Sequence, residues 1–306
     1  MKLCLGTLAA SPWGGAQEPP PVASRMVDAH VHFYDPTRPQ GVPWPAKGTP
    51  LYHPAYPKDW AAVANKVGVK ETIVVECSKL LADNDWILNL AAREKSILGF
   101  IGRVSPGTPD FAKDLKRLAA NPLFRGIRVD SDDLRNNIGT AEFVANVRLL
   151  GELDLTLEVS GFDDLNQIAT FADKVAATRI VLGHAGSPGN PKAIRPDWKE
   201  GIAAVARRRN VTSKVSALVE YNGSQNGNAP TDPAVYRPIL DHLWETFGDD
   251  RLFFGSNWPV CESSASYEAL FKIVADFFKA KGGDDCEKFF WKNSQAAYKW
   301  TDRKPG

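Results

Sequence analysis

The chain has 306 residues, of which 43% are hydrophobic and 24% charged, as expected for a globular protein with a large core. Its 37 Lys and Arg residues balance 36 Asp and Glu residues, so the charge gives no reason to expect a nucleic acid or an anionic membrane as partner. No apolar run approaches the roughly 20 residues that span a bilayer. The expected partner is a small-molecule substrate, and the sequence leaves open whether the chain forms a homo-oligomer.

Residues 1–25 differ from the rest of the chain. Lys2 precedes a short apolar stretch, small residues follow at a cleavage-type spacing, and the Pro-rich segment EPPPVASR comes last. The pattern is typical either of a minimal export signal or of a disordered tail. It therefore leaves open whether the protein is cytoplasmic or exported. Residues 26–306 are predicted to form a single domain.

From residue 27 onward, short runs rich in β-branched and aromatic residues alternate with amphipathic segments that read as helices. The predicted strands are 27–33, 71–77, 97–104, 124–129, 154–160, 179–186, 210–218 and 251–259. Alternating strands and helices indicate βαβ units and a parallel sheet. Eight units in a chain of this length predict an α/β fold of the (β/α)8 TIM-barrel type.

The clearest helix is expected to have Thr108 as its N-cap and Pro109 as its first residue. Its buried face would carry Phe111, Leu115, Leu118 and Ala119.

Three segments that leave predicted strands are long: 34–57, 186–196 and 219–231. Long connections without secondary structure are usually functional in a compact domain. Because they follow the carboxyl ends of strands, they predict a barrel with long βα loops and an active site at that end.

Side chains alternate across a strand, so polar residues of one parity identify the face that meets the barrel interior. In the first strand, Asp28, His30 and His32 share one face, and the apolar residues between them share the other. The same argument turns seven further polar residues inward, namely Glu76, Arg128, Glu158, His184, Lys214, Ser216 and Asn257. Burying so many polar groups is costly unless they pair or line a cleft, which predicts a convergent site.

His30 and His32 are spaced so that both imidazoles can reach one ion or one substrate, and His184 ends another strand. A His-x-His pair alone is equally consistent with a structural role, and the third histidine favours a functional one. For Arg128 and Lys214, ion pairs with Glu76 and Glu158 are as well supported as substrate binding.

The segments DAHVHFYDP, NPLFRGIRV, VLGHAGSP, NVTSKVSAL, FGSNWPV and NSQAAYKW occur in this order along the chain. In these segments the chain resembles the amidohydrolase-related family of barrel hydrolases, and within it lactone hydrolases such as fuconolactonase, sulfomuconolactonase and pyrone-dicarboxylate hydrolase. The resemblance covers essentially the whole chain after the leader.

The resemblance implies that His30, His32 and His184 hold a divalent metal, Zn²⁺ first among the candidates, or contact substrate in a metal-free mechanism. It implies that Arg125 or Arg128 holds a substrate carboxylate. Asn257 stands where the family usually has an Asp that serves as general base. An amide lacks that basicity, so a metal hydroxide, Glu158 or Glu76 would have to activate the water. Whether Asn257 is the natural residue is left open.

We therefore predict an enzyme that opens a cyclic ester, either a sugar lactone or a carboxylated lactone. His184 would polarise the carbonyl, Arg128 and Lys214 would anchor the substrate, and Trp44 would belong to an aromatic lid that excludes water. One alternative is a barrel decarboxylase that acts on an unsaturated carboxylic acid. Another is a metabolite-binding protein in which Asn257 marks lost catalysis.

Overall fold

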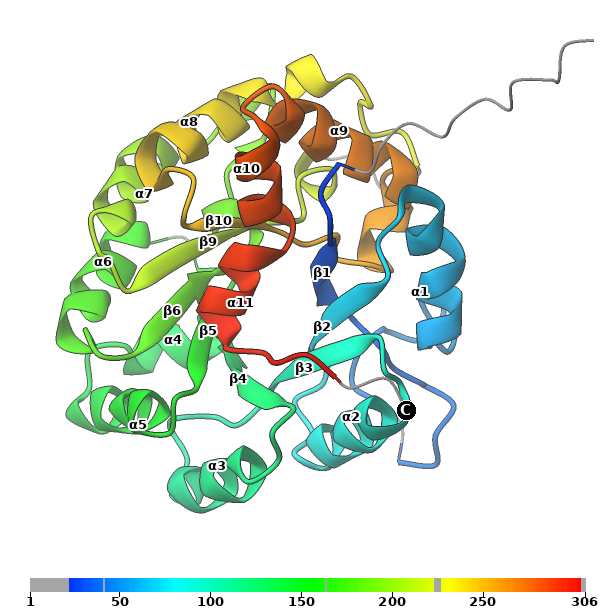
Figure 1. Ribbon diagram of the computed structural model, residues 1–306. Coiled ribbons are helices and arrows are strands. Elements are labelled where there is room, and N and C mark those ends of the chain that lie inside the picture. The colour runs from blue at the N-terminus through cyan, green and yellow to red at the C-terminus, as the bar shows by residue number, and fades with distance from the viewer. Residues whose placement is uncertain (1–21, 41, 163, 223–226, 304–306) are drawn as a thin grey trace, which may run out of the picture.

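The computed structural model describes residues 22–40, 42–162, 164–222 and 227–303. Eight parallel strands form one sheet in the order β1-β2-β3-β4-β5-β6-β9-β10, which curves into a barrel (Figure 1). Their bounds are Val27–Val31, Glu71–Val75, Ile97–Gly102, Phe124–Val129, Thr156–Val159, Arg179–Leu182, Val211–Val215 and Leu252–Phe254. The seam between β1 and β10 is bridged just past β10, where the His32 amide donates to the Trp258 carbonyl at 2.8 Å and the Asn257 amide to that of His30 at 2.9 Å. The predicted (β/α)8 barrel is confirmed.

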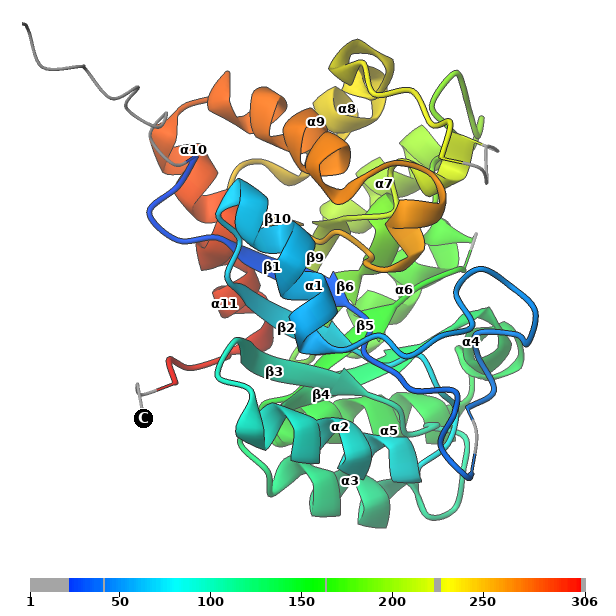
Figure 2. The same ribbon diagram turned by 90° about the vertical axis from the view of Figure 1, so that its right-hand side faces the viewer.

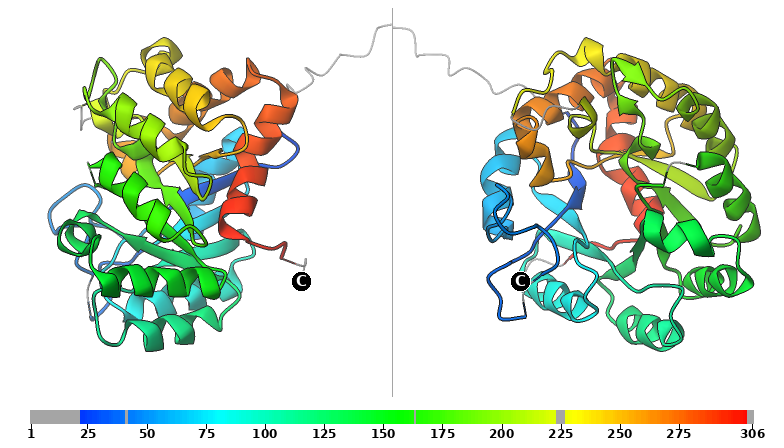
Figure 3. Two further views of the ribbon diagram at one scale, coloured as in Figure 1. Left: turned by 90° about the vertical axis from the view of Figure 1, so that its left-hand side faces the viewer. Right: turned by 180° about the vertical axis from the view of Figure 1, so that it is seen from behind.

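Helices surround the barrel (Figures 2 and 3). The α-helices are α1 Pro57–Ala64, α2 Ala82–Arg93, α3 Phe111–Ala119, α4 Ser131–Asn137, α5 Ala141–Glu152, α6 Leu165–Lys174, α7 Trp198–Ala206, α8 Arg237–Phe247, α9 Tyr267–Lys279, α10 Gly283–Glu287 and α11 Asn293–Tyr298. Short turns of helix are η1 Asn65–Val67, η2 Gly183–Gly186, η3 Glu220–Asn222, η4 Pro233–Val235, η5 Val260–Ser263 and η6 Lys288–Lys292, and β7 Gly189–Asn190 pairs with β8 Ala193–Ile194. In the described residues, no helix is long and apolar enough to span a membrane.

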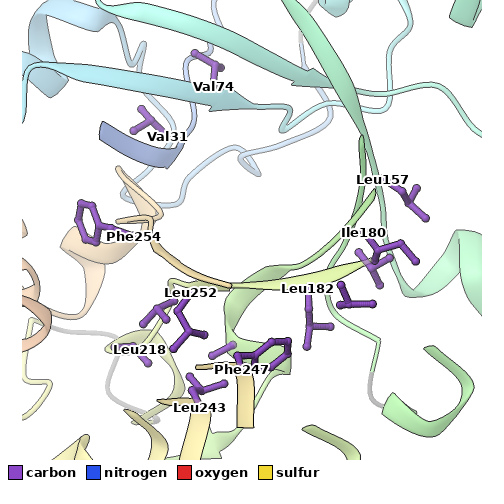
Figure 4. Close-up of a cluster of buried hydrophobic side chains, with 14 of the residues drawn as sticks. Val31, Val74, Leu157, Ile180, Leu182, Leu218, Leu243, Phe247, Leu252 and Phe254 are labelled. Atoms are coloured by element: carbon purple, nitrogen blue, oxygen red, sulfur yellow. The ribbon is translucent and has the colours of Figure 1, made fainter. Parts of the chain in front are cut away.

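The main core lies between the strands and the helices. Outward-facing strand residues such as Leu182 and Leu252 pack with helix residues such as Leu243 and Phe247 of α8 (Figure 4). Burying large aliphatic side chains contributes about 1.5–3 kcal/mol each, so this layer provides most of the stabilisation of the barrel.

Helix α3 begins two residues later than predicted. Thr108 and Pro109 lie in the preceding turn, where the Thr108 hydroxyl donates to the Ser105 carbonyl, and Asp110 is the N-cap. Phe111, Leu115 and Leu118 are buried as expected, and Ala119 packs against the core at its edge.

The amino-terminal end of the barrel is covered by α11 (Figure 1). Thr156 and Arg179, the first residues of β5 and β6, donate from their side chains to the Ala297 carbonyl at 2.7 and 2.9 Å. Tyr298 and Trp300 are buried with apolar residues of the barrel interior. This end is therefore filled, and a substrate must enter from the opposite one. The predicted leader or tail at 1–25 lies outside the described residues except for 22–25.

The first strand contains a bulge that overturns one prediction. Asp28 pairs with Thr72 and Val31 with Val74, so β1 carries one residue more than β2 across this stretch. Asp28 consequently faces the helices, where Tyr267 of α9 donates to it at 2.9 Å. The strict alternation that placed Asp28 beside the histidines fails because a bulge reverses the parity of the residues before it.

Candidate active site

The predicted long loops gather at the carboxyl ends of the strands, seen from that side in the right-hand view of Figure 3. A cavity of about 300 Å³ lies there. It is lined by His32, Pro43, Trp44, Glu76, Cys77, Lys79, Arg103, Arg128 and Asp130. Trp44, which the sequence analysis assigns to an aromatic lid, lines this cavity with its indole 5.9 Å from the His32 ring, centroid to centroid.

The three predicted histidines meet beside this cavity, and His32 is the one that lines it. The Nε2 atoms of His30 and His32 are 3.2 Å apart, and the ring centroids of His30 and His184 are 4.6 Å apart. His30 and His32 are buried, whereas His184 is partly exposed. Burial lowers the pKa of all three, that of His32 to about 3, so each imidazole is neutral near pH 7.

The partner of each imidazole decides which ring nitrogen carries the hydrogen. His32 Nδ1 lies 2.9 Å from the Val75 carbonyl, which can only accept, so Nδ1 donates and Nε2 keeps a bare lone pair. Lys214 Nζ lies 3.3 Å from His30 Nδ1. Glu158 Oε1 lies farther from the same nitrogen, at 3.6 Å. Because the ammonium is closer and can only donate, we assign His30 Nδ1 as the acceptor and place the hydrogen on Nε2.

His184 follows β6 in a left-handed backbone conformation with φ 53°. Its backbone N–H donates to Ser216 Oγ at 3.3 Å, and its Nδ1 lies 2.9 Å from the same oxygen. Within the described residues, Nδ1 is the acceptor available to the buried Ser216 hydroxyl hydrogen. The hydroxyl therefore donates to Nδ1, and His184 Nε2 carries a hydrogen.

Lys214 and Glu158 lie beneath the histidines. Lys214 Nζ donates to Glu158 Oε2 at 2.7 Å, and Tyr298 donates to the same oxygen from α11, also at 2.7 Å. The side chains of Lys214 and Glu158 are fully buried, and burial lowers the pKa of Lys214 to about 8. The predicted ion pair between them is present. Both lie on the side of His30 away from His32 Nε2, where Lys214 Nζ is 3.3 Å from His30 Nδ1, so their position fits support of His30.

Glu76 and Arg128 face the cavity as a pair. Arg128 Nε donates to Glu76 Oε1 at 2.8 Å and its Nη2 to the Glu76 carbonyl at 2.7 Å. Arg125 is not brought to the site. Its Nε donates to the Tyr298 carbonyl at 2.8 Å, which places it at the end of the barrel that α11 covers.

Asn257 lies beside His32 with its Oδ1 3.2 Å from His32 Nε2, and its backbone has a left-handed φ of 64°. Its Nδ2 donates to Glu220 Oε1 at 2.7 Å. Glu220 was not predicted as a site residue, although it lies in the long segment 219–231 that was expected to be functional. Loop residues lack the alternation that assigns side chains to a face, so no sequence signal distinguished it.

The predicted three-histidine metal site does not fit this arrangement. Among the described residues, no group of three His, Cys, Asp or Glu side chains is placed to hold one ion. A histidine needs a bare nitrogen to bind zinc, and the contacts above leave one on His32 only. The other nitrogen of a ligating histidine normally donates to an acceptor, whereas the group nearest to His30 Nδ1 is the Lys214 ammonium at 3.3 Å, with Glu158 Oε1 farther away at 3.6 Å.

Known proteins similar to this chain share its architecture. An L-fucono-1,5-lactonase from Burkholderia ambifaria is 29% identical over 242 residues, which cover 76% of this chain and 80% of the relative. An amidohydrolase from Burkholderia multivorans with bound HEPES has a TM-score of 0.83 at 24% identity, covering 91% of this chain and 100% of that chain. A second crystal form of an amidohydrolase from that species, with bound zinc, has a TM-score of 0.81 at 24% identity and the same coverage.

The family model described as amidohydrolase matches residues 27–300, a span that runs from β1 past α11 and contains every residue of the site described above. The chain therefore belongs to the amidohydrolase family, and it is a hydrolase.

Proposed function

We propose that this hydrolase opens the ring ester of an uncharged, hydroxylated lactone, such as a sugar lactone. The observation that carries the proposal is the meeting of two imidazole N–H groups, on His30 and His184, with one bare imidazole nitrogen, on His32. The similarity to a protein named L-fucono-1,5-lactonase supports the substrate class.

In the proposed reaction, the lactone carbonyl oxygen accepts hydrogen bonds from His184 Nε2 and His30 Nε2. Neutral donors aimed at an oxygen that becomes negative lower the barrier most where water is excluded. In the free protein, the His30 hydrogen is directed at His32 Nε2, 3.2 Å away. When His30 Nε2–H donates to the lactone carbonyl instead, the His32 lone pair becomes free. Substrate binding itself would therefore activate the base.

His32 Nε2 then takes a proton from water as the water oxygen bonds to the carbonyl carbon. Its pKa is low, but the adjacent oxyanion favours the protonated ring as the tetrahedral intermediate forms. When the ring C–O bond breaks, this proton passes to the departing alkoxide. One water is consumed, the ring opens to a hydroxy acid, and His32 returns to its starting state.

The cations of the cavity favour an uncharged substrate. Arg128 is paired with Glu76 at 2.8 Å, Arg103 with Asp133 at 2.7 Å, and Lys79 with Asp132 at 2.9 Å. A dicarboxylate would have to compete with these carboxylates for the cations. Hydroxyl groups need only the guanidinium hydrogens of Arg128 that Glu76 leaves free, and the indole of Trp44 can cover an apolar sugar face.

The test is acid release, followed with a pH indicator, from L-fucono-1,5-lactone, D-glucono-1,5-lactone, a muconolactone and 2-pyrone-4,6-dicarboxylate, with carbon dioxide measured in parallel. We expect rapid ring opening of the sugar lactones and no carbon dioxide. Faster turnover of the dicarboxylate would contradict the substrate class. Carbon dioxide release, or acid release from none of the four, would reject the lactonase proposal.

A further inference from the structure

Three side chains form a line that leads away from the cavity. His32 Nε2 is 3.2 Å from Asn257 Oδ1, and Asn257 Nδ2 is 2.7 Å from Glu220 Oε1. They come from the residue after β1, the segment after β10 and η3, so the loop that follows β9 delivers a carboxylate to the end of the neighbouring strand. Asn257 separates that carboxylate from the base of the proposed reaction.

Besides Asn257, only the backbone amides of Val219 and Glu220 itself stabilise the charged Glu220 carboxylate within the described residues. Its Oε2 is buried and has no hydrogen-bond partner among residues 22–222 and 227–303 that are described. Within the same residues, no Lys, Arg or His side chain forms an ion pair with Glu220. The titratable groups that face it are the Tyr236 hydroxyl and the Cys261 thiol, and burial keeps both neutral by raising their pKa, that of Tyr236 to about 12. A buried, unpaired carboxylate is costly, and such groups concentrate at functional sites.

The contact with Glu220 decides which end of the Asn257 amide faces His32. Once Glu220 is ionised, its oxygens can only accept hydrogen bonds, so they hold the amide N–H₂ and turn Oδ1 toward His32. While His32 Nε2 is bare, two acceptors face each other at 3.2 Å. Once Nε2 has taken a proton, the same pair becomes an N–H···O hydrogen bond. The interaction is thus favourable only after proton transfer, which is the kind that accelerates a reaction.

We propose that Glu220 is a positioning residue that locks the Asn257 amide so that its oxygen stabilises protonated His32. The inference rests on the proposed hydrolysis, in which His32 is the base. Glu220 and Asn257 together then supply what one carboxylate at the end of β10 would supply alone: an acceptor at His32 and a negative charge behind it.

The first variant is Glu220→Gln, which keeps the size of the side chain but removes the charge. A neutral glutamine can pair with either end of Asn257, so the amide is no longer locked. On a sugar lactone at pH 8, we expect kcat to fall about tenfold to a hundredfold while KM stays unchanged. Glu245→Gln, on the exposed face of α8, is the matched control and should keep the wild-type kcat. An unchanged kcat in Glu220→Gln would overturn the proposal.

The second variant exchanges acid and amide, as Asn257→Asp with Glu220→Gln. The glutamine introduced at position 220 can donate to the new carboxylate, whose other oxygen faces His32, so the acceptor and the charge are both restored. We expect this double variant to recover most of the kcat that Glu220→Gln loses. A purely structural role predicts no recovery, and a double variant as slow as Glu220→Gln would overturn the proposal.

A measurement without substrate separates this inference from the proposed function. In protein labelled with ¹⁵N-histidine, the Nε2 resonance of His32 reports whether its lone pair accepts a hydrogen bond. We expect Glu220→Gln to shift it, because the freed amide can turn and donate, while His242 on α8 stays unchanged. Identical His32 shifts in both proteins would overturn the lock even if no lactone were a substrate.

Discussion

At the residue scale, the chemistry of each site histidine depends on a partner from another strand. The Val75 carbonyl of β2 determines which ring nitrogen of His32 carries the hydrogen. Lys214 of β9 does the same for His30, and Ser216, just after β9, does so for His184. All three imidazoles are neutral, so their roles as donor or acceptor follow from these contacts and not from charge. Three similar side chains thereby offer two donors and one acceptor.

The role of His184 can be tested by substitution. His184→Ala removes a donor to the carbonyl oxygen, and loss of one such donor typically costs about a hundredfold to a thousandfold in kcat. Stopped-flow acid release from a sugar lactone measures this. His242→Ala on α8 is the control, because His242 donates to the Lys199 carbonyl away from the site. Equal kcat in the two variants would contradict the role of His184.

Glu220 should also be visible in the pH dependence of stability. Burial raises the pKa of Glu220 to about 7, above the value of roughly 4.3 in an unfolded chain. Between these values the unfolded chain releases the proton and the folded chain keeps it, so stability falls as pH rises through this window. Glu220→Gln abolishes this loss and should gain about 3 kcal/mol over the wild type between pH 4 and pH 8, as measured by urea unfolding. Parallel pH profiles of the unfolding free energy in the two proteins would refute the raised pKa of Glu220.

At the element scale, two features set the site apart from an ideal barrel. The bulge in β1 turns Asp28 outward, where it accepts the Ser256 amide at 2.8 Å and the His30 amide at 3.2 Å. One buried carboxylate thus joins the first strand to the segment after the last, at the point where His30 and Asn257 emerge. Helix α11 performs the corresponding task at the other end, since Tyr298 reaches Glu158 beneath the histidines.

The contribution of α11 can be measured through Tyr298, which is fully buried. Tyr298→Phe leaves Glu158 with one donor fewer and should cost about 1–2 kcal/mol of unfolding free energy. Tyr298→Ala adds a cavity and should cost about 3–5 kcal/mol. Urea unfolding of both, with Lys292→Ala as an exposed control, provides the comparison. Equal stability of the Phe and Ala variants would mean that the ring is not packed as described.

At the scale of the whole molecule, the two ends of the barrel are unequal. One is covered by α11 and filled with apolar side chains, and the other opens into a cavity of about 300 Å³. The donors and the base lie in β1 or within two residues of the ends of β1 and β6, while the loops form the walls. This division is the usual one in enzymes of this fold.

Whether the protein needs a metal can be tested on the whole molecule, since a similar solved structure contains zinc. Among the three site histidines, only His32 presents a nitrogen that is free of a donor from the surrounding strands. We therefore expect kcat on a sugar lactone to be unchanged after dialysis against a chelator and after addition of Zn²⁺. Metal content of the dialysed protein, measured by plasma emission, accompanies the rates. A loss of activity that Zn²⁺ alone restores would show that the histidine network rearranges around an ion.

The sequence by itself determined the barrel and most of the candidate site. Each predicted strand overlaps an observed one, because runs of β-branched and aromatic residues between polar segments leave few other ways to bury them. Alternation within a strand correctly turned His30, His32 and Lys214 inward. Strand formation and side-chain alternation depend on residues that are neighbours in the sequence, so the sequence pattern predicts them.

The tertiary structure alone decided what depends on two distant segments. The bulge that turns Asp28 outward arises from pairing between β1 and β2, and α11, far along the chain, holds Arg125 away from the site. Glu220 joins Asn257 through a loop without periodicity. The hydrogen on each imidazole depends on a partner that only folding brings within about 3 Å, so no single segment of sequence could specify it.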